Sequence, residues 1–182
     1  TGGSLASSPG LALATDGSLF VSDQTYSFST SIASGPVKEF DSGGTFFLEL
    51  IADGSSGLSG PAGMVIDGDT LFTASKMNGD ILKTDLNTSI TTVFASTGAT
   101  FEAGVLAMLS DGSVITGSAS GNGNIYHFGL DGTLLGTFAS GLGQVGGIAA
   151  IPEPKTYVTI FSALALLTVL VARNRRRTSS SN

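Results

Sequence analysis

The sequence predicts an all-β body followed by a single C-terminal membrane-spanning helix. Gly makes up 26 of the 182 residues and charged residues only 12%, which is typical of short strands joined by tight turns. A short apolar motif that leads into an Asp-Gly-type turn recurs along residues 1–151. Residues 156–172 contain no charge, no Gly and no Pro, which is typical of the short end of membrane spans.

The net charge of −6 is unevenly distributed. Residues 1–152 hold 13 acidic and 3 basic residues, whereas residues 153–182 hold one acid and five bases. The acidic body disfavours nucleic-acid binding, which needs a basic surface. The absence of Cys excludes thiol catalysis, disulfides and Cys-ligated metals. Because the chain starts at Thr1 without a signal peptide, we expect that an N-terminal segment has been removed or that the chain is a fragment.

The C-terminal segment predicts a membrane helix over residues 156–172, about 25 Å long at the usual helical rise. Basic residues collect on the cytoplasmic side of such helices, so the body is expected on the opposite side. A buried amphipathic helix and a permanent single-pass anchor are the alternatives. The expected span includes Thr156, Tyr157, Phe161, Leu164, Leu167, Leu170 and Ala172, and the basic cluster that follows it is Arg173, Arg175, Arg176 and Arg177.

Pro152-Glu153-Pro154 precedes the apolar span, and its two prolines hold the chain extended. This order of Pro-Glu-Pro, apolar span and arginines resembles the PEP-CTERM sorting signal of Gram-negative bacteria. The resemblance covers residues 152–177, although the span lacks glycines and residues 178–182 extend beyond the arginines. It implies recognition by an exosortase at the inner membrane, cleavage near the Pro-Glu-Pro motif, and transfer of the body to the cell surface or extracellular matrix.

The body repeats with a period of about 40 residues or slightly more. Apolar segments opened by Gly10, Gly63 and Gly104 each lead to an Asp-Gly-type turn and a second apolar segment, and Gly147 opens a fourth copy. Each unit continues with two further strands joined by a turn. A four-stranded antiparallel unit of this length is a propeller blade. The expected blades cover about residues 9–50, 60–95 and 102–140, with a partial blade over 144–151.

The repeat motifs, such as Pro9-Gly10-Leu11-Ala12 and Pro61-Ala62-Gly63-Met64-Val65, resemble NHL-type propellers. The resemblance implies a partial β-propeller of about three and a half blades, taken from a ring of six or seven. A sandwich or a solenoid is the alternative all-β architecture. Because three and a half blades leave the ring open, we expect upstream blades outside this sequence.

No residue of the body is assigned a catalytic role. Asp16, Asp67, Asp111 and Asp131 lie in hairpin-turn motifs and lack the spacing of a calcium loop. The single histidine, His127, lies on a predicted strand without an identifiable acid–base partner. No Gly-x-Ser-x-Gly motif is present.

Some six-bladed propellers resemble gluconolactonases, which hold a divalent metal at the central channel. In this sequence, that resemblance points to Glu102 as a metal ligand, with Asn78 and either Asn122 or Asn124 nearby. Oxygen ligands of this kind suit calcium. Turn residues and a solvated acid are the alternative interpretation of these side chains.

The sequence therefore predicts an exported, non-enzymatic surface protein. Its C-terminus would lie in the cytoplasm until processing, and its propeller body would bind an exopolysaccharide or a surface protein through loops on a rigid scaffold. No cofactor and no nucleic-acid partner are expected. The alternative is an exported, calcium-dependent propeller hydrolase or lactonase.

Overall fold

A computed structural model describes residues 3–27, 29, 32–119 and 123–150. Residues 1–150 form one compact unit, which is the body of the protein. The expected sorting motif Pro152–Pro154, the span 156–172 and the basic cluster 173–177 lie outside the described residues. Among the residues described, no helix is long and apolar enough to cross a membrane.

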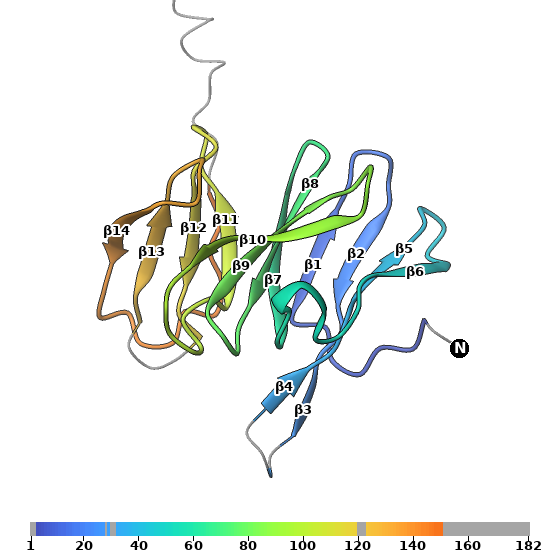
Figure 1. The fold of residues 1–182 in the computed structure, drawn as a ribbon, viewed down its shortest axis with the longest axis horizontal. Coiled ribbons are helices and arrows are strands. Elements are labelled where there is room, and N and C mark those ends of the chain that lie inside the picture. Colours follow the sequence, from blue (N-terminus) through green and yellow to red (C-terminus); the bar gives the residue numbers. More distant parts are fainter. Residues whose placement is uncertain (1–2, 28, 30–31, 120–122, 151–182) are drawn as a thin grey trace, which may run out of the picture. The chain divides into compact units, whose positions relative to one another are not determined.

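The body is all-β, as predicted, and is built from three four-stranded antiparallel sheets (Figure 1). Each sheet corresponds to one repeat and is called a blade. Blade 1 has the strand order β1-β2-β5-β6. Its strands are β1 (Gly10–Leu13), β2 (Leu19–Ser22), β5 (Val37–Phe40) and β6 (Phe46–Ile51).

A two-stranded hairpin is inserted into blade 1 between β2 and β5. It consists of β3 (Thr25–Ser27) and β4 (Ile32–Ser34), and these strands pair only with each other. The inserted hairpin explains why the first repeat is longer than the next two, a difference that the sequence alone left unexplained. Figure 1 shows that it projects away from the blades.

Blades 2 and 3 have the simple order of consecutive strands. A short 3₁₀ turn at Ser55–Gly57 precedes blade 2. The strands of blade 2 are β7 (Pro61–Asp67), β8 (Thr70–Ser75), β9 (Asp80–Asp85) and β10 (Ile90–Ser96). Those of blade 3 are β11 (Val105–Met108), β12 (Val114–Gly117), β13 (Ile125–Phe128) and β14 (Leu134–Ala139).

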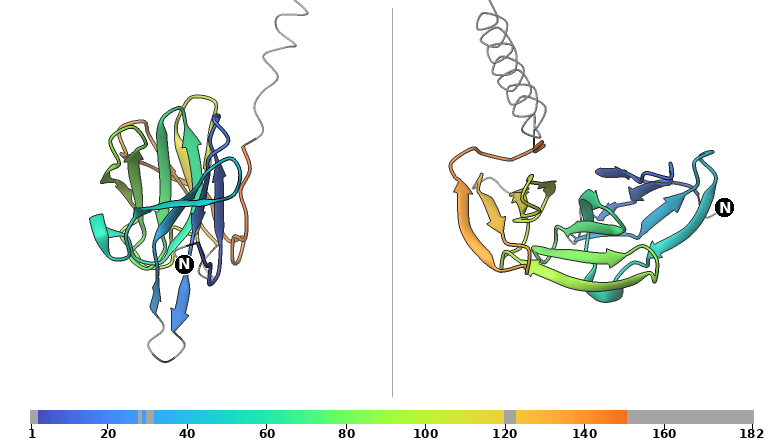
Figure 2. Two further views of the ribbon diagram at one scale, coloured as in Figure 1. Left: turned by 90° about the vertical axis from the view of Figure 1, so that its right-hand side faces the viewer. Right: turned by 90° about the horizontal axis from the view of Figure 1, so that it is seen from above.

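The first strands of the three blades lie together, since β7 contacts both β1 and β11 (Figure 2). Their close approach explains the glycine that opens the repeats. A Cβ atom on Gly10 would run into the Ala62 carbonyl of β7, and one on Gly63 would lie 2.6 Å from Val105 Cα of β11. No larger side chain fits at either position without movement of the backbone.

Apolar cores fill the space between neighbouring blades. Phe20 and Val37 of blade 1 pack with Leu71 and Leu82 of blade 2. A second core joins blades 2 and 3, with Phe128 fully buried at its centre. Each strand sends alternate side chains to its two faces, so blade 2 packs one face on blade 1 and the other on blade 3.

The strand expected at 144–151 is not formed over the described residues 144–150. This segment instead lies along blade 3, where Val145 N–H donates a hydrogen bond to the carbonyl of Ser118 at 3.0 Å. The side chains of Val145 and Ile148 cover Gly117. In each of the three blades, the first strand pairs with the second strand of the same unit, and no such partner follows within the described part of this repeat.

Candidate functional site

Glu102, the candidate calcium ligand, lies in the linker that enters blade 3 and is only 5% exposed. Asn78 links two turns: its amide donates to the Gly57 carbonyl of the 3₁₀ turn at 2.8 Å, and its Oδ1 accepts the Asp80 N–H. The amide of Asn124 donates to the Tyr126 hydroxyl at 3.1 Å. Asn122 lies outside the described residues. Across the described part of the chain, no three Asp, Glu or His side chains gather as a metal site.

The Asp-Gly motifs close hairpins, as the sequence predicts. The carboxylates of Asp16, Asp111 and Asp131 each accept the backbone N–H two residues further along, at 2.9 to 3.0 Å. These hydrogen bonds, with those from the neighbouring hydroxyls, hold the pKa of each carboxyl below its ordinary value. Asp67 ends β7 beside the same kind of turn. The side chains therefore shape turns.

His127 has partners that sequence reasoning missed. Its Nε2 lies 2.8 Å from the Ser113 hydroxyl, which donates to Asp111 Oδ1 at 2.6 Å. The serine therefore gives its proton to the carboxylate and accepts one from the imidazole. In a hydrolytic triad the imidazole stands between serine and carboxylate, so this order does not activate Ser113 as a nucleophile. His127 lies opposite Ile115 in the β12–β13 pairing, and Ser113 precedes β12, so the contact depends on the register of the two strands and on no sequence motif.

A polar pocket of about 210 Å³ lies between the turns of blades 1 and 2. Blade 1 contributes Asp16, Ser18 and Glu39, and blade 2 contributes Asp69 and Asn87. The Asn87 amide donates to Asp69 at 3.1 Å. Burial raises the pKa of Glu39, and the negative charge of Asp16 raises it further. Sequence reasoning missed the pocket because its walls come from different repeats.

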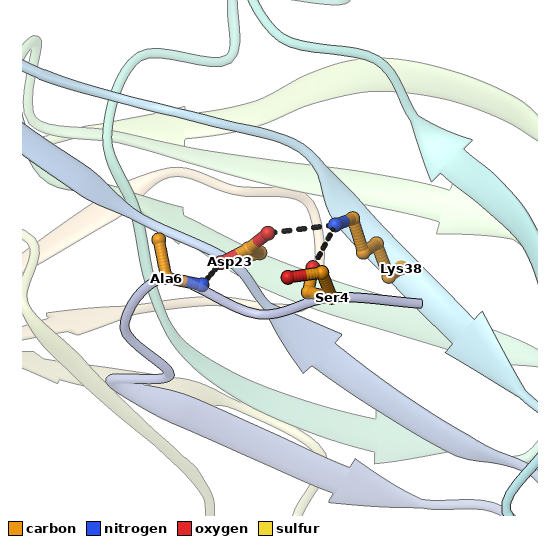
Figure 3. Close-up of polar contacts among 4 residues, drawn as sticks. All are labelled: Ser4, Ala6, Asp23 and Lys38. Atoms are coloured by element: carbon orange, nitrogen blue, oxygen red, sulfur yellow. Dashed lines mark hydrogen bonds and ion pairs between the residues drawn. The ribbon is translucent and has the colours of Figure 1, made fainter. Parts of the chain in front are cut away.

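An ion pair joins Asp23, which follows β2, to Lys38 of β5 in blade 1 (Figure 3). Lys38 Nζ lies 2.8 Å from Asp23 Oδ2, and the two side chains are 8% and 10% exposed. The N-terminal segment covers the pair: Lys38 donates to the Ser4 carbonyl, and the Ala6 N–H donates to Asp23, both at 2.6 Å. All of these partners belong to the fold, so the pair holds the N-terminal segment in place.

The surroundings of the ion pair also shift the pKa of Asp23. Burial alone would raise its pKa, but the hydrogen bonds from Lys38 and Ala6, together with the charge of Lys38, outweigh burial and lower it. The pKa of Asp23 is therefore shifted down, whereas burial in the pocket shifts that of Glu39 up.

No family model and no curated protein matches the chain. Solved structures do match its fold. A chain of the nidogen/laminin complex is similar with a TM-score of 0.55 and 20% identity, covering 77% of this chain and 51% of that one. A chain of the mitotic checkpoint complex gives 0.57 and 19%, covering 76% and 39%. The computationally designed Ika8 protein gives 0.55 and 18%, covering 78% and 39%.

The chain thus spans between 39% and 51% of the length of these three matched chains. At such low identities the similarity shows the fold alone. The body has the all-β, propeller-like architecture of antiparallel blades.

Proposed function

We propose that the chain is an exported surface protein whose body is a binding scaffold and whose C-terminal segment is a PEP-CTERM sorting signal read by an exosortase. The observation that carries the proposal is the order of Pro152-Glu153-Pro154, the apolar residues 156–172 and the arginines 173–177. A processing enzyme needs an extended substrate, and the two prolines favour that conformation. The apolar span would hold the protein in the inner membrane until it is cleaved.

The body supports the scaffold role through its architecture. Three sheets joined by apolar cores are rigid, and their turns present polar groups around the pocket between blades 1 and 2. We propose that an exopolysaccharide or a surface protein binds at these turns. The finer architecture that we propose is part of a six- or seven-bladed ring, because the outer faces of blades 1 and 3 lack a neighbouring blade among the described residues.

The calcium-dependent hydrolase has less support. It needs Glu102 at an accessible oxygen-lined site, whereas Glu102 is buried and the described residues bring no three acidic or imidazole side chains together. The amide of Asn78 is bonded to the Gly57 carbonyl and that of Asn124 to the Tyr126 hydroxyl.

Replacing Pro152 and Pro154 with Ala tests the sorting proposal in a host that has an exosortase. The double variant should stay uncleaved in the inner membrane, whereas the parent chain should be released. Pro9→Ala/Pro36→Ala is the matched control, because it removes the same number of prolines from the body. Normal release of the Pro152/Pro154 variant would refute the sorting proposal.

Binding of the purified protein to host cells with and without exopolysaccharide tests the scaffold role. Asn87→Ala should weaken binding because it alters a wall of the pocket, whereas Asp131→Asn, in a turn of blade 3, should not. Equal binding by both variants and the parent would exclude this pocket as the ligand contact.

A further inference from the structure

The pocket between blades 1 and 2 lies where three turns meet. These turns join β1 to β2, β7 to β8 and β9 to β10. Figure 1 shows the first two of them at the end of the blades opposite the β3–β4 hairpin. Both blades have all four of their strands, and a shared apolar core joins them. The walls of the pocket are therefore held in place by the packing of the two blades.

The lining of the pocket combines an apolar floor with a polar rim. Phe20 is buried, and Ala14 and Leu86 are half-buried. The exposed lining residues are Thr15, Asp16, Asp69 and Asn87. Small-molecule sites commonly join apolar walls with a few polar groups that fix the ligand's orientation. A sugar ring has matching surfaces, with C–H groups on its faces and hydroxyls around its edge. The volume of about 210 Å³ is about seven times the share of liquid water that one molecule fills, which suits one sugar unit.

The charge of the lining is negative. Asp16, Glu39 and Asp69 contribute carboxyl groups, and none of the described residues that line the pocket is Lys, Arg or His. Lys38 is next to Glu39 on β5 but points to the opposite face of the strand, where it pairs with Asp23. The pocket therefore disfavours acidic sugars and favours a ligand that carries a positive charge.

Glu39 is the carboxyl group best placed to bind that charge. It is half-buried in the pocket, whereas Asp16 accepts the Ser18 N–H at 2.9 Å. Asp69 accepts the Asn87 amide at 3.1 Å. Burial and, second, the negative charge of Asp16 raise the pKa of Glu39, and no hydrogen bond from a described residue lowers it. An ammonium group beside Glu39 would offset both causes.

The repeat shows that Glu39 is particular to this junction. Glu39 stands opposite Phe20, which packs in the core between blades 1 and 2. In the next blade, Lys83 stands in the same way opposite Phe72, which packs in the core between blades 2 and 3. The second junction thus has a basic residue at the position where the first has an acidic one.

We infer that this pocket binds one unit of a saccharide that carries a free amino group. The ammonium lies against Glu39, and the ring hydroxyls reach the exposed turns. The inference rests on the proposed scaffold function and narrows its exopolysaccharide to one that contains amino sugars. A lysine side chain of a surface protein offers the same ammonium, but it has no hydroxyls for the polar groups of the rim, such as Thr15 and Asn87.

Isothermal titration calorimetry of the full chain in mild detergent tests the inference. The probes are a glucosamine pentamer, its N-acetylated counterpart and pentalysine, at a pH slightly below neutral. The glucosamine pentamer should bind on the order of tenfold to a hundredfold more tightly than the N-acetylated one, which is the ratio that one hydrogen bond between charged groups supports.

Glu39→Gln should remove that preference by weakening the binding of the glucosamine pentamer alone. Glu49→Gln is the matched control, because it makes the same change in blade 1 at an exposed position of β6 that stands opposite Lys38. Its affinity for the glucosamine pentamer should equal that of the parent. Circular dichroism would confirm that both variants are folded.

Equal binding of the two sugar pentamers, or binding of neither, would overturn the inference. So would a glucosamine affinity that Glu39→Gln leaves unchanged. Pentalysine that binds as tightly as the glucosamine pentamer and depends on Glu39 would assign the pocket to a protein ligand, which also overturns it. The scaffold function is judged separately, by binding to cells with and without exopolysaccharide.

Discussion

Replacing Lys38 with Leu should destabilise the body strongly, because it leaves the Asp23 carboxylate buried without its cation. The carboxylate would keep the Ala6 N–H, and the Ser4 carbonyl would lose its donor. Removing one partner of a buried pair costs about 3–5 kcal/mol, and the slight exposure of this pair places the expected loss at about 3 kcal/mol. In urea, the midpoint should fall by about 1.5 M for an m-value of about 2 kcal/mol/M.

The repeat supplies the compensating variant. Blade 2 has Leu82 and Ser75 at the positions of Lys38 and Asp23, and Ser75 Oγ accepts the Ser59 N–H at 2.8 Å as Asp23 accepts that of Ala6. Lys38→Leu/Asp23→Ser should therefore recover most of the loss, to within about 1 kcal/mol of the parent. Urea unfolding followed by circular dichroism measures both variants.

Lys83→Leu controls for the change in charge, because Lys83 is exposed on β9 and its replacement should alter stability by less than about 0.5 kcal/mol. A loss below about 1 kcal/mol for Lys38→Leu would refute the reasoning. So would a double variant no more stable than the single one.

Three further perturbations follow from the structure. The folded-state pKa of Asp23 is lowered, so its contribution to stability is present above the unfolded-state pKa of about 4. That contribution is lost as the pH falls through the folded-state pKa. Acid titration of unfolding should thus show a steeper loss below about pH 4 for the parent than for Lys38→Leu/Asp23→Ser. The raised pKa of Glu39 has the opposite sign, so Glu39→Gln should raise the urea midpoint slightly at pH 7 but not at pH 3. Gly63→Ala should lower the free energy of unfolding in urea by about 1–3 kcal/mol, because its Cβ would meet β11. Gly146→Ala is the control and should be neutral, because no atom lies within 4 Å of its Cβ position. Equal effects of the two variants would contradict the close approach of β7 and β11.

The all-β fold could be predicted from the sequence because the same local chemistry recurs in each repeat. Gly63 and Gly104 open first strands at places where neighbouring backbones meet, and the Asp-Gly turns cap their own N–H groups. Such features depend only on residues close in sequence, and their recurrence in three copies strengthens the prediction of the repeat. The β3–β4 hairpin was missed because its short, polar strands interrupt the repeat and lack its apolar pattern.

The contacts between distant residues could not be predicted from the sequence. Lys38 reaches Ser4, 34 residues away, and His127 reaches Ser113 through strand pairing. The pocket combines Glu39 with Asp69 and Asn87 across two blades. These contacts depend on which face each strand turns to its neighbour. A shift of one residue in strand register moves every side chain of the strand to the opposite face. A small error in the predicted strand ends therefore assigns these residues to the wrong neighbours.

The sorting proposal is the central claim, and an intact-mass measurement tests it most directly. The full parent gene would be expressed in a host that has an exosortase and in a strain of that host whose exosortase gene is deleted. The intact mass of the protein would then be measured by mass spectrometry in each cell fraction. The proposal predicts a body that lacks everything after about Pro154, found outside the inner membrane in the positive host alone. An intact chain, with residues 156–177 still attached in the membrane of both strains, would contradict it.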